Sequence, residues 1–414
     1  MTSFDKAIVG VVKKHLSFIY ITANIVCAIL FSINGYLGGD FSGTVISNPD
    51  NLFFSLLLVI FFIFIYQFAV FSLINRVNIP SVSYEYRGVL DITALVLSFL
   101  GIYGAIVYDI GIVGVGADRN ANSIMIKLIS YVISIFQPVW FCLIYIYYRV
   151  CVGYNKLFII NILAYTVLIL ATGQTVQFIA LIYVYMYIYF RRKHVFPLSR
   201  LISLSIVGVL LYPFFRFLKY SIIASSAYNV EVGIMMQNAI SEKSLYDLYA
   251  DMFFVGLERF QVVANTEYLL TNISSISSNY TPSISSFLSG FWLFDSIYKM
   301  LGYSIATIPT PQVYLATMIN GMDNWASHIG LYGYMVFFGS NAIFVYIISI
   351  LMIITSVVIS KFLIKSPFFI LISWISSFIL IVHGWVIQYM SFLQALIIFA
   401  FFIVFCQFFI KKYR

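Results

Sequence analysis

The chain has 414 residues, of which 62% are hydrophobic and only 9% are charged. A soluble domain carries roughly 25% charged residues, so this composition excludes a soluble globular protein. The net charge of +8 does not indicate a nucleic-acid surface, because most basic residues stand in short loops between apolar runs. We therefore expect an all-α, polytopic membrane protein.

Apolar runs of about 20 residues are long enough to cross a bilayer as helices. Ten such runs occur, seven before one long polar stretch and three after it. The predicted spans are 15–37, 52–74, 89–109, 128–149, 157–172, 174–190, 200–219, 331–358, 367–386 and 391–410. The first follows Lys13 and Lys14 and lacks a small-residue cleavage site, so we expect a retained helix rather than a cleaved signal peptide.

The basic residues predict the orientation of these spans. Sixteen of the 23 Lys and Arg residues fall on one side of the predicted membrane, which also holds both termini. Loops rich in Lys and Arg stay in the cytoplasm. We therefore predict three parts: a bundle of seven spans (1–219) with a cytoplasmic N-terminus, a large extracytoplasmic loop (220–330) and three C-terminal spans (331–414).

The long loop is expected to contain short interfacial helices. Residues 244–270 have helical spacing, and Leu248, Met252, Val255 and Arg259 fall on one stripe. Such a helix can lie along the membrane with its apolar side down. An arginine on that stripe needs an anionic partner, which is either a carboxylate of the protein or a phosphate of a substrate. Residues 290–303 are apolar enough for a second interfacial or re-entrant helix.

The densest group of chemically useful side chains precedes the eighth span. It contains Asp323, Trp325 and His328. A histidine there can act as a base or donate a hydrogen bond, and Asp323 can orient it or be the base itself. Trp325 can stack on a sugar ring or anchor the chain at the interface. A purely structural role for His328 remains the alternative.

Cations on the same predicted side are candidates for binding phosphate. Arg216 and Lys219 end the seventh span, and Arg259 and Arg119 are the other arginines on the outer side. The arginine fork matches phosphate oxygens, and lysine adds a point charge. The alternative for Arg216 and Lys219 is that they extend to the lipid headgroups. Glu258 is a further candidate base.

Other classes of chemistry lack support in the sequence. The four cysteines (Cys27, Cys142, Cys151 and Cys406) lie in or at the ends of predicted spans, so we expect no disulfide framework. No His/Cys spacing resembles a zinc site, and no P-loop, GxGxxG or HExxH motif occurs. We expect neither a metal nor a cofactor, although carboxylates of the loop can in principle hold Mg²⁺.

The layout resembles the bacterial O-antigen polymerases, also called oligosaccharide repeat-unit polymerases or the Wzy family. In sequence the resemblance rests on Thr172-Gly173-Gln174, on Gly256-Leu257-Glu258-Arg259-Phe260 and on Ser327-His328-Ile329-Gly330-Leu331-Tyr332-Gly333. The last segment also resembles the region of O-antigen ligases that carries a loop histidine. The resemblance implies a multi-pass protein of the bacterial inner membrane whose active site faces the periplasm.

The resemblance further implies a glycosyltransferase that acts on undecaprenyl-diphosphate-linked oligosaccharides. A hydroxyl of a lipid-linked repeat unit would attack the anomeric carbon of the growing glycan, and undecaprenyl diphosphate would leave. His328, Asp323 and Glu258 would be the candidates for accepting the proton. Arg216, Arg259, Lys219 and Arg119 would bind the diphosphate, and Trp325 would contact sugar. Membrane lipids, a chain-length regulator and a flippase are the expected partners, and nucleic acid is not.

Three alternatives remain open at this stage, and one of them is a non-catalytic scaffold, which would leave Arg216, Arg259 and His328 pointing apart. A lipid-linked oligosaccharide flippase would use the same lipid, but it should have about twelve or more spans, short loops and charges inside the bundle. An O-antigen ligase would use the same donor with a different acceptor. The seven-plus-three arrangement around one long loop favours the polymerase.

Overall fold

The computed structural model describes residues 3–81, 88–112, 123–174, 176–193, 198–228, 230–258, 260–280, 282–289, 291, 300, 309–321 and 325–413. This part of the chain is helical, and its one strand-like pairing is an isolated bridge between Tyr36 and Val45. It divides into two compact units. Unit 1 comprises residues 1–84 and 260–401, and unit 2 comprises residues 85–259 and 402–414. The all-α prediction is confirmed for the described residues.

Unit 1 is built from long helices at both ends of the chain and short helices between them. Its elements are α1 (Ser3–Asn34), the 3₁₀ turn η1 (Gly39–Phe41), α2 (Pro49–Ile63), the π-helix η2 (Phe64–Val70), α3 (Phe71–Asn75), α12 (Val263–Thr271), α13 (Ile273–Asn279), α14 (Ile284–Ser289), α16 (Pro311–Asn320), α17 (Gly330–Phe338), η3 (Gly339–Asn341), α18 (Ala342–Leu363), α19 (Pro367–Ser376), the π-helix η4 (Ser377–Ile381) and most of α20 (Val386–Tyr413).

Unit 2 contains eight helices in its described part. These are α4 (Gly88–Tyr108), α5 (Ile124–Phe136), α6 (Pro138–Val152), α7 (Lys156–Thr172), α8 (Gln177–Lys193), α9 (Leu198–Tyr228), α10 (Val232–Glu242) and α11 (Leu245–Glu258). Helix α4 packs against α6 and α7, while α10 and α11 pack against α9.

A buried ion pair joins α4 to α6 in unit 2. The Arg149 Nε donates to Asp91 Oδ1 over 2.7 Å, and both side chains are almost fully excluded from the surface. Tyr145 and Asn155 also donate to the Asp91 carboxylate, over 2.6 and 3.1 Å. A charge in an apolar bundle is tolerated when it is paired and hydrogen-bonded in this way. The cluster therefore fixes how α4 and α6 pack.

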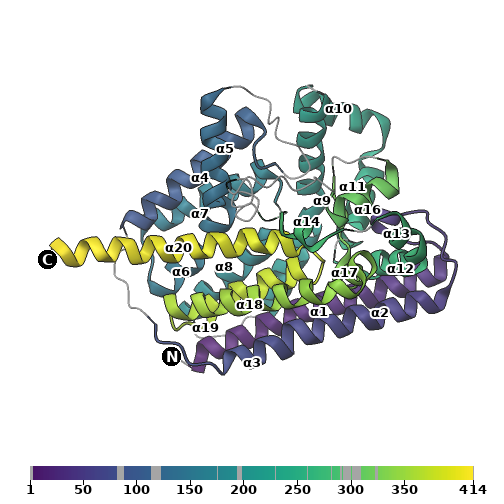
Figure 1. Cartoon of the computed structure of the whole chain (residues 1–414). Coiled ribbons are helices and arrows are strands. Elements are labelled where there is room, and N and C mark those ends of the chain that lie inside the picture. Colours follow the sequence, from purple (N-terminus) through teal and green to yellow (C-terminus); the bar gives the residue numbers. More distant parts are fainter. Residues whose placement is uncertain are drawn as a thin grey trace. The chain divides into compact units, whose positions relative to one another are not determined.

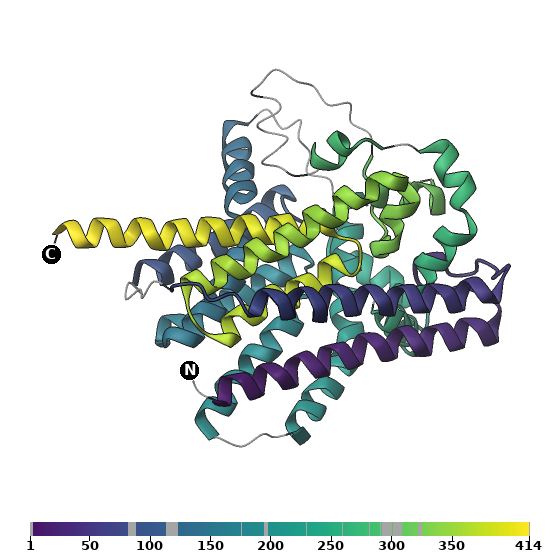
Figure 2. The same cartoon turned by 60° about the horizontal axis from the view of Figure 1, so that its bottom comes forward.

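In unit 1, α1 packs against α2, and η2 and α3 continue the line of α2 (Figures 1 and 2). Helix α12 packs along α2 and also contacts η1 and α17. Its two ends are attached to the long helices by side chains. Asn24 of α1 binds the backbone before α12, and Asn51 of α2 donates to the Thr271 hydroxyl at its C-terminal end over 3.2 Å.

Five helices are long and apolar enough to cross a membrane, namely Asp5–Asn34, Pro49–Asn75, Gly88–Tyr108, Gly330–Leu363 and Val386–Gln407. The pair Ile124–Phe136 and Pro138–Val152, bent by 41°, can supply a sixth. Helices Lys156–Thr172 and Pro367–Ile381 are apolar but shorter. These findings, which cover only the described residues, support a helical membrane protein, while the count of ten spans and their orientation stay predictions.

Three local expectations need correction. The first apolar helix begins well before residue 15, so Lys13 and Lys14 lie within it. The helix predicted at 244–270 is divided into α11 and α12, which belong to different units. The segment predicted as one span at 367–386 ends as a helix at Ile381, and a turn with a left-handed glycine, Gly384, precedes α20. The predicted division into 1–219, 220–330 and 331–414 stays a prediction.

Candidate functional site

His328 lies buried in unit 1 just before α17 begins, with 4% of its surface exposed. Its Nε2 donates to the backbone carbonyl of Gln261 over 3.0 Å, since a carbonyl oxygen only accepts. Its Nδ1 lies 3.6 Å from Asp40 Oδ2, which is an ion-pair distance rather than a hydrogen bond. Both ring nitrogens therefore face oxygen atoms of the protein.

Asp40 connects the η1 turn to the residues before α17. Its Oδ2 accepts a 2.7 Å hydrogen bond from the Ser327 hydroxyl. The Asn265 amide of α12 donates to the same Ser327 oxygen over 3.1 Å and to the His328 carbonyl over 2.7 Å. We call Asp40, Asn265, Ser327 and His328 the junction network. It ties three segments that are far apart in sequence into one buried polar site.

The junction network contains Ser, His and Asp, but it is not arranged as a hydrolytic triad. In a triad the histidine accepts the proton of the serine, and the carboxylate binds the other ring nitrogen. Here Ser327 donates directly to Asp40, and Ser327 is fully buried. The arrangement therefore does not activate Ser327 as a nucleophile.

Three buried amides around this network each have one atom without a hydrogen-bond partner among the described residues. They are Gln261 Nε2, Asn265 Oδ1 and Gln312 Oε1. Buried polar groups are normally satisfied by protein or water. The unpaired atoms mark the surroundings of the junction network as polar, in contrast to the apolar helices of unit 1.

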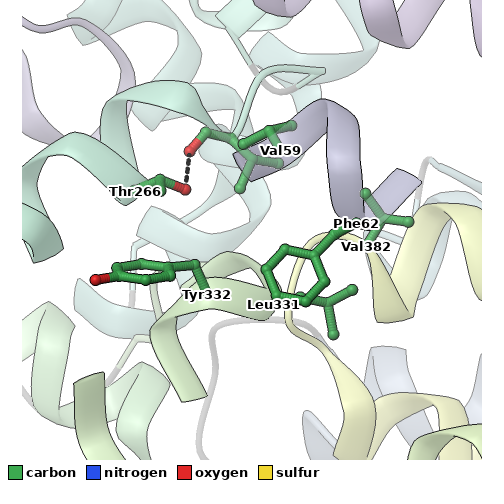
Figure 3. Close-up of a pocket in the computed structure, with 7 residues that line it drawn as sticks. Val59, Phe62, Thr266, Leu331, Tyr332 and Val382 are labelled. Atoms are coloured by element: carbon green, nitrogen blue, oxygen red, sulfur yellow. Dashed lines mark hydrogen bonds between the residues drawn. The ribbon is translucent and has the colours of Figure 1, made fainter. Parts of the chain in front are cut away.

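A small pocket of unit 1 is lined by residues of α2, α12 and α17 and of the segments before α12 and α20 (Figure 3). Its volume is about 10 Å³, and it is lined by Val59, Phe62, Val262, Thr266, Leu331, Tyr332 and Val382. Figure 3 shows the Thr266 hydroxyl turned to a backbone carbonyl, which belongs to Val262 at 3.0 Å, and the Tyr332 hydroxyl directed away from Phe62. The lining is mostly apolar, and the space is about enough for one water molecule, so this pocket is too small for a sugar or a phosphate.

Arg216 is the second candidate, and it lies in unit 2 on α9. Its side chain is buried, with 7% of the residue exposed. It donates to the hydroxyls of Tyr212 and Tyr220, one helical turn to either side, and its guanidinium carbon lies 4.9 Å from the centre of the Tyr220 ring. Its Nε has no partner, and no carboxylate binds it among the described residues.

The local fold explains why Arg216 is covered. Tyr249 of α11 donates to the Leu210 carbonyl of α9 over 3.0 Å. A Cβ on Gly256 would lie only 2.5 Å from the Tyr212 ring, so α11 approaches α9 closely at that glycine. Arginine normally needs an anionic partner when it is buried. Arg216 thus offers a positive charge that the described protein leaves without a counter-ion.

The remaining predicted site residues are distributed as follows. Asp323, Arg259 and Arg119 lie outside the described residues, as do the side chains of Glu258 and Lys219. Trp325 is partly exposed, and its indole nitrogen donates to the Asn320 side chain over 2.9 Å. His328 and Arg216 belong to different units. Their assigned roles stay predictions.

Asp40, Asn265, Gln261 and His383 are the residues that sequence reasoning missed. In the sequence Asp40 is one of several carboxylates between the first two predicted spans and elsewhere on the predicted outer side. His383 stands inside a predicted span, and an ionisable residue there is by default a functional candidate. The position of His383 inside a predicted span could therefore have identified it, whereas the sequence around Asp40 and Asn265 does not indicate which residues they bind.

Glu267 is another buried acid, on α12 with 2% of its surface exposed. Burial raises the pKa of its carboxyl above the usual value, and a 3.0 Å hydrogen bond from Thr271 opposes that shift only in part. No ion pair involves Glu267 in the described part of the chain. Within the same residues, no three His, Cys, Asp or Glu side chains are grouped so as to hold a metal ion.

Comparison with known proteins gives no relative for this chain: no family model, no curated protein and no solved structure matches it.

Proposed function

We propose that this protein is a membrane glycosyltransferase that polymerises undecaprenyl-diphosphate-linked oligosaccharide repeat units at the periplasmic face of a bacterial inner membrane. The observation that carries the proposal is Arg216, a buried arginine with an unpaired Nε and no carboxylate partner among the described residues. A planar guanidinium in this state is suited to the oxygens of a diphosphate.

In the proposed reaction the acceptor hydroxyl forms a bond to the anomeric carbon of the growing glycan, and the bond from that carbon to the diphosphate breaks. Arg216 binds the diphosphate and stabilises its charge as it leaves, with Arg259, Lys219 and Arg119 as further candidate cations. The hydroxyl proton goes to a base, for which His328, Asp323 and Glu258 are the candidates.

The junction network adds a condition to the role of His328. Its Nε2–H is used by the Gln261 carbonyl, so the nitrogen left for proton transfer is Nδ1, which lies 3.6 Å from Asp40. We therefore propose that His328 and Asp40 work as a pair, with Asp40 holding the ring through its Nδ1 side.

The proposal is tested by deleting the gene in its host and separating the lipopolysaccharide on a gel. A polymerase deletion gives a band with a single repeat unit, whereas complete loss of O-antigen would favour the ligase or the flippase. Plasmid-borne Arg216→Ala should reproduce the deletion at normal protein level.

Lys243→Ala is the matched control, because it removes a cation of unit 2 that forms an ion pair with Asp251, and both of these side chains are exposed to solvent. We expect this variant to restore the full ladder. If Arg216→Ala also restores it, Arg216 does not bind the substrate.

A further inference from the structure

The turn between η4 and α20 packs directly against the start of α17. The Gly330 N–H donates to the His383 carbonyl over 3.1 Å. Gly384 has φ +81°, and a Cβ there would lie 2.6 Å from the Gly330 oxygen and 2.8 Å from the Gly330 nitrogen. Only glycine fits such a close backbone approach in this conformation. The turn and the residues around His328 therefore form one rigid contact.

Two side chains add hydrogen bonds to this contact between the turn and α17. Gln312 of α16 and Tyr334 of α17 both donate to the Gly384 carbonyl over 2.7 Å. The Gln312 backbone carbonyl accepts from the Ser327 N–H over 3.0 Å. The Gly384 carbonyl is thus bonded to α17, the helix that follows His328. It is also bonded to Gln312, which in turn binds Ser327, the residue before His328.

The His383 side chain reaches the catalytic candidate itself. Its ring packs edge-to-face on the His328 ring, with 5.4 Å between centroids and 78° between planes. Its Nε2 shares a 2.9 Å hydrogen bond with the Tyr20 hydroxyl of α1, and Tyr20 is 1% exposed. Asp40 and Gln261 face the two nitrogens of His328, and His383 contacts the ring itself.

We propose that His383, held by Tyr20, is a positioning residue that sets the orientation of the His328 ring during glycosyl transfer. This inference rests on the proposed function and adds to it a buried pair of residues from α1 and the turn before α20. The proposal gives His328 a role in proton transfer and Arg216 the role in donor binding, and His383 acts on the His328 ring. The effect should therefore fall on the rate of transfer rather than on the apparent affinity for the donor.

The test uses purified full-length protein in detergent with a synthetic polyprenyl-diphosphate repeat unit. Tyr20→Phe and His383→Ala should each lower kcat by about 10- to 100-fold, since a small misplacement of a reacting group has effects of that size, while KM changes less than about 2-fold. His383→Gln retains a group that can bond to Tyr20, so it should recover part of the lost kcat.

The matched control is Tyr389→Phe, which removes another buried tyrosine hydroxyl of unit 1, bonded to Ser356 over 2.6 Å. Both Tyr→Phe changes should lower thermal stability to a similar extent, but only Tyr20→Phe should lower kcat. Equal kcat for Tyr20→Phe and Tyr389→Phe would overturn the positioning role.

A second readout is independent of the reaction. The chain has four histidines, so ¹⁵N-histidine NMR gives few signals, and each is assigned by substitution. Tyr20→Phe should shift the His328 ring signal, and Tyr389→Phe should leave it in place. An unmoved His328 signal contradicts the inference even if wild-type protein makes polymer, and wild-type protein that makes no polymer contradicts the proposed function instead.

Discussion

The described part of unit 2 contains two buried arginines, one paired with a carboxylate and one without such a partner, which makes their removal informative. Arg149 is 1% exposed and bound to both oxygens of Asp91, whereas Arg216 is 7% exposed and has no carboxylate partner among the described residues. We compare Arg149→Met with Arg216→Met, which both remove the charge and keep most of the length. Removing a structural arginine should lower the thermal stability of the protein, whereas removing a substrate-binding arginine should abolish activity with little change in stability.

For Arg149→Met, an unpaired carboxylate is left in the bundle. Breaking a buried pair in this way costs about 3–5 kcal/mol. For a unit of this size, each kcal/mol corresponds to roughly 2–4 °C in Tm, so we expect a fall of about 6–20 °C. The Asp91 carboxylate would retain only its hydrogen bonds from Tyr145 and Asn155.

For Arg216→Met, losses and gains nearly cancel. The change removes two bonds to tyrosine hydroxyls and a cation–π contact of about 0.5–2 kcal/mol. It also removes a desolvated charge and an unpaired N–H, whose burial costs about 1–3 kcal/mol. We expect the free energy of unfolding to change by less than about 2 kcal/mol, while activity is lost.

The assay is thermal unfolding of each variant in the same detergent, followed by intrinsic fluorescence, with size-exclusion chromatography to confirm that the starting samples are monodisperse. A fall in Tm for Arg216→Met as large as that for Arg149→Met would refute the reasoning, because it would make Arg216 a structural residue.

Two further predictions concern single side chains. Burial raises the pKa of Glu267, so the folded state holds this proton more tightly than the unfolded state and the contribution to stability is lost as pH rises through the folded pKa. Glu267→Gln should therefore gain Tm relative to wild type between about pH 4 and 7, and a constant difference across that range would contradict this. Gly256→Ala places a Cβ 2.5 Å from the Tyr212 ring, which should displace that partner of Arg216 and destabilise unit 2 by about 1–3 kcal/mol. The displacement should weaken donor binding, and unchanged KM in the transfer assay would argue against it.

The helices were largely predictable because apolar runs and helical spacing are local signals. The break between α11 and α12 was not, since neither proline nor glycine stands between Glu258 and Val263. Its cause lies 238 residues away: Asn24 accepts from the Val262 N–H over 2.8 Å and donates to the Phe260 carbonyl over 3.2 Å. These bonds take the backbone groups that a continuous helix would use.

The candidate site was predictable in part for the same reason. His328 and Arg216 stand out by residue type at the ends of apolar segments. Asp40 does not, because its bond to Ser327 spans 287 residues and η1 shows no distinctive local pattern. The turn at Gly384 was signalled by a histidine and a glycine inside an apolar run, but its packing on Gly330 is a tertiary contact that one sequence does not reveal.

The most direct test of the central claim is chain extension by the purified protein. A synthetic polyprenyl-diphosphate repeat unit is incubated with wild-type protein and with Arg216→Met, and product length is read by mass spectrometry. We predict lipid-linked products of several repeats and free polyprenyl diphosphate with wild type, and unextended substrate with the variant. Equal extension by both proteins, or none by well-folded wild type, would contradict the account.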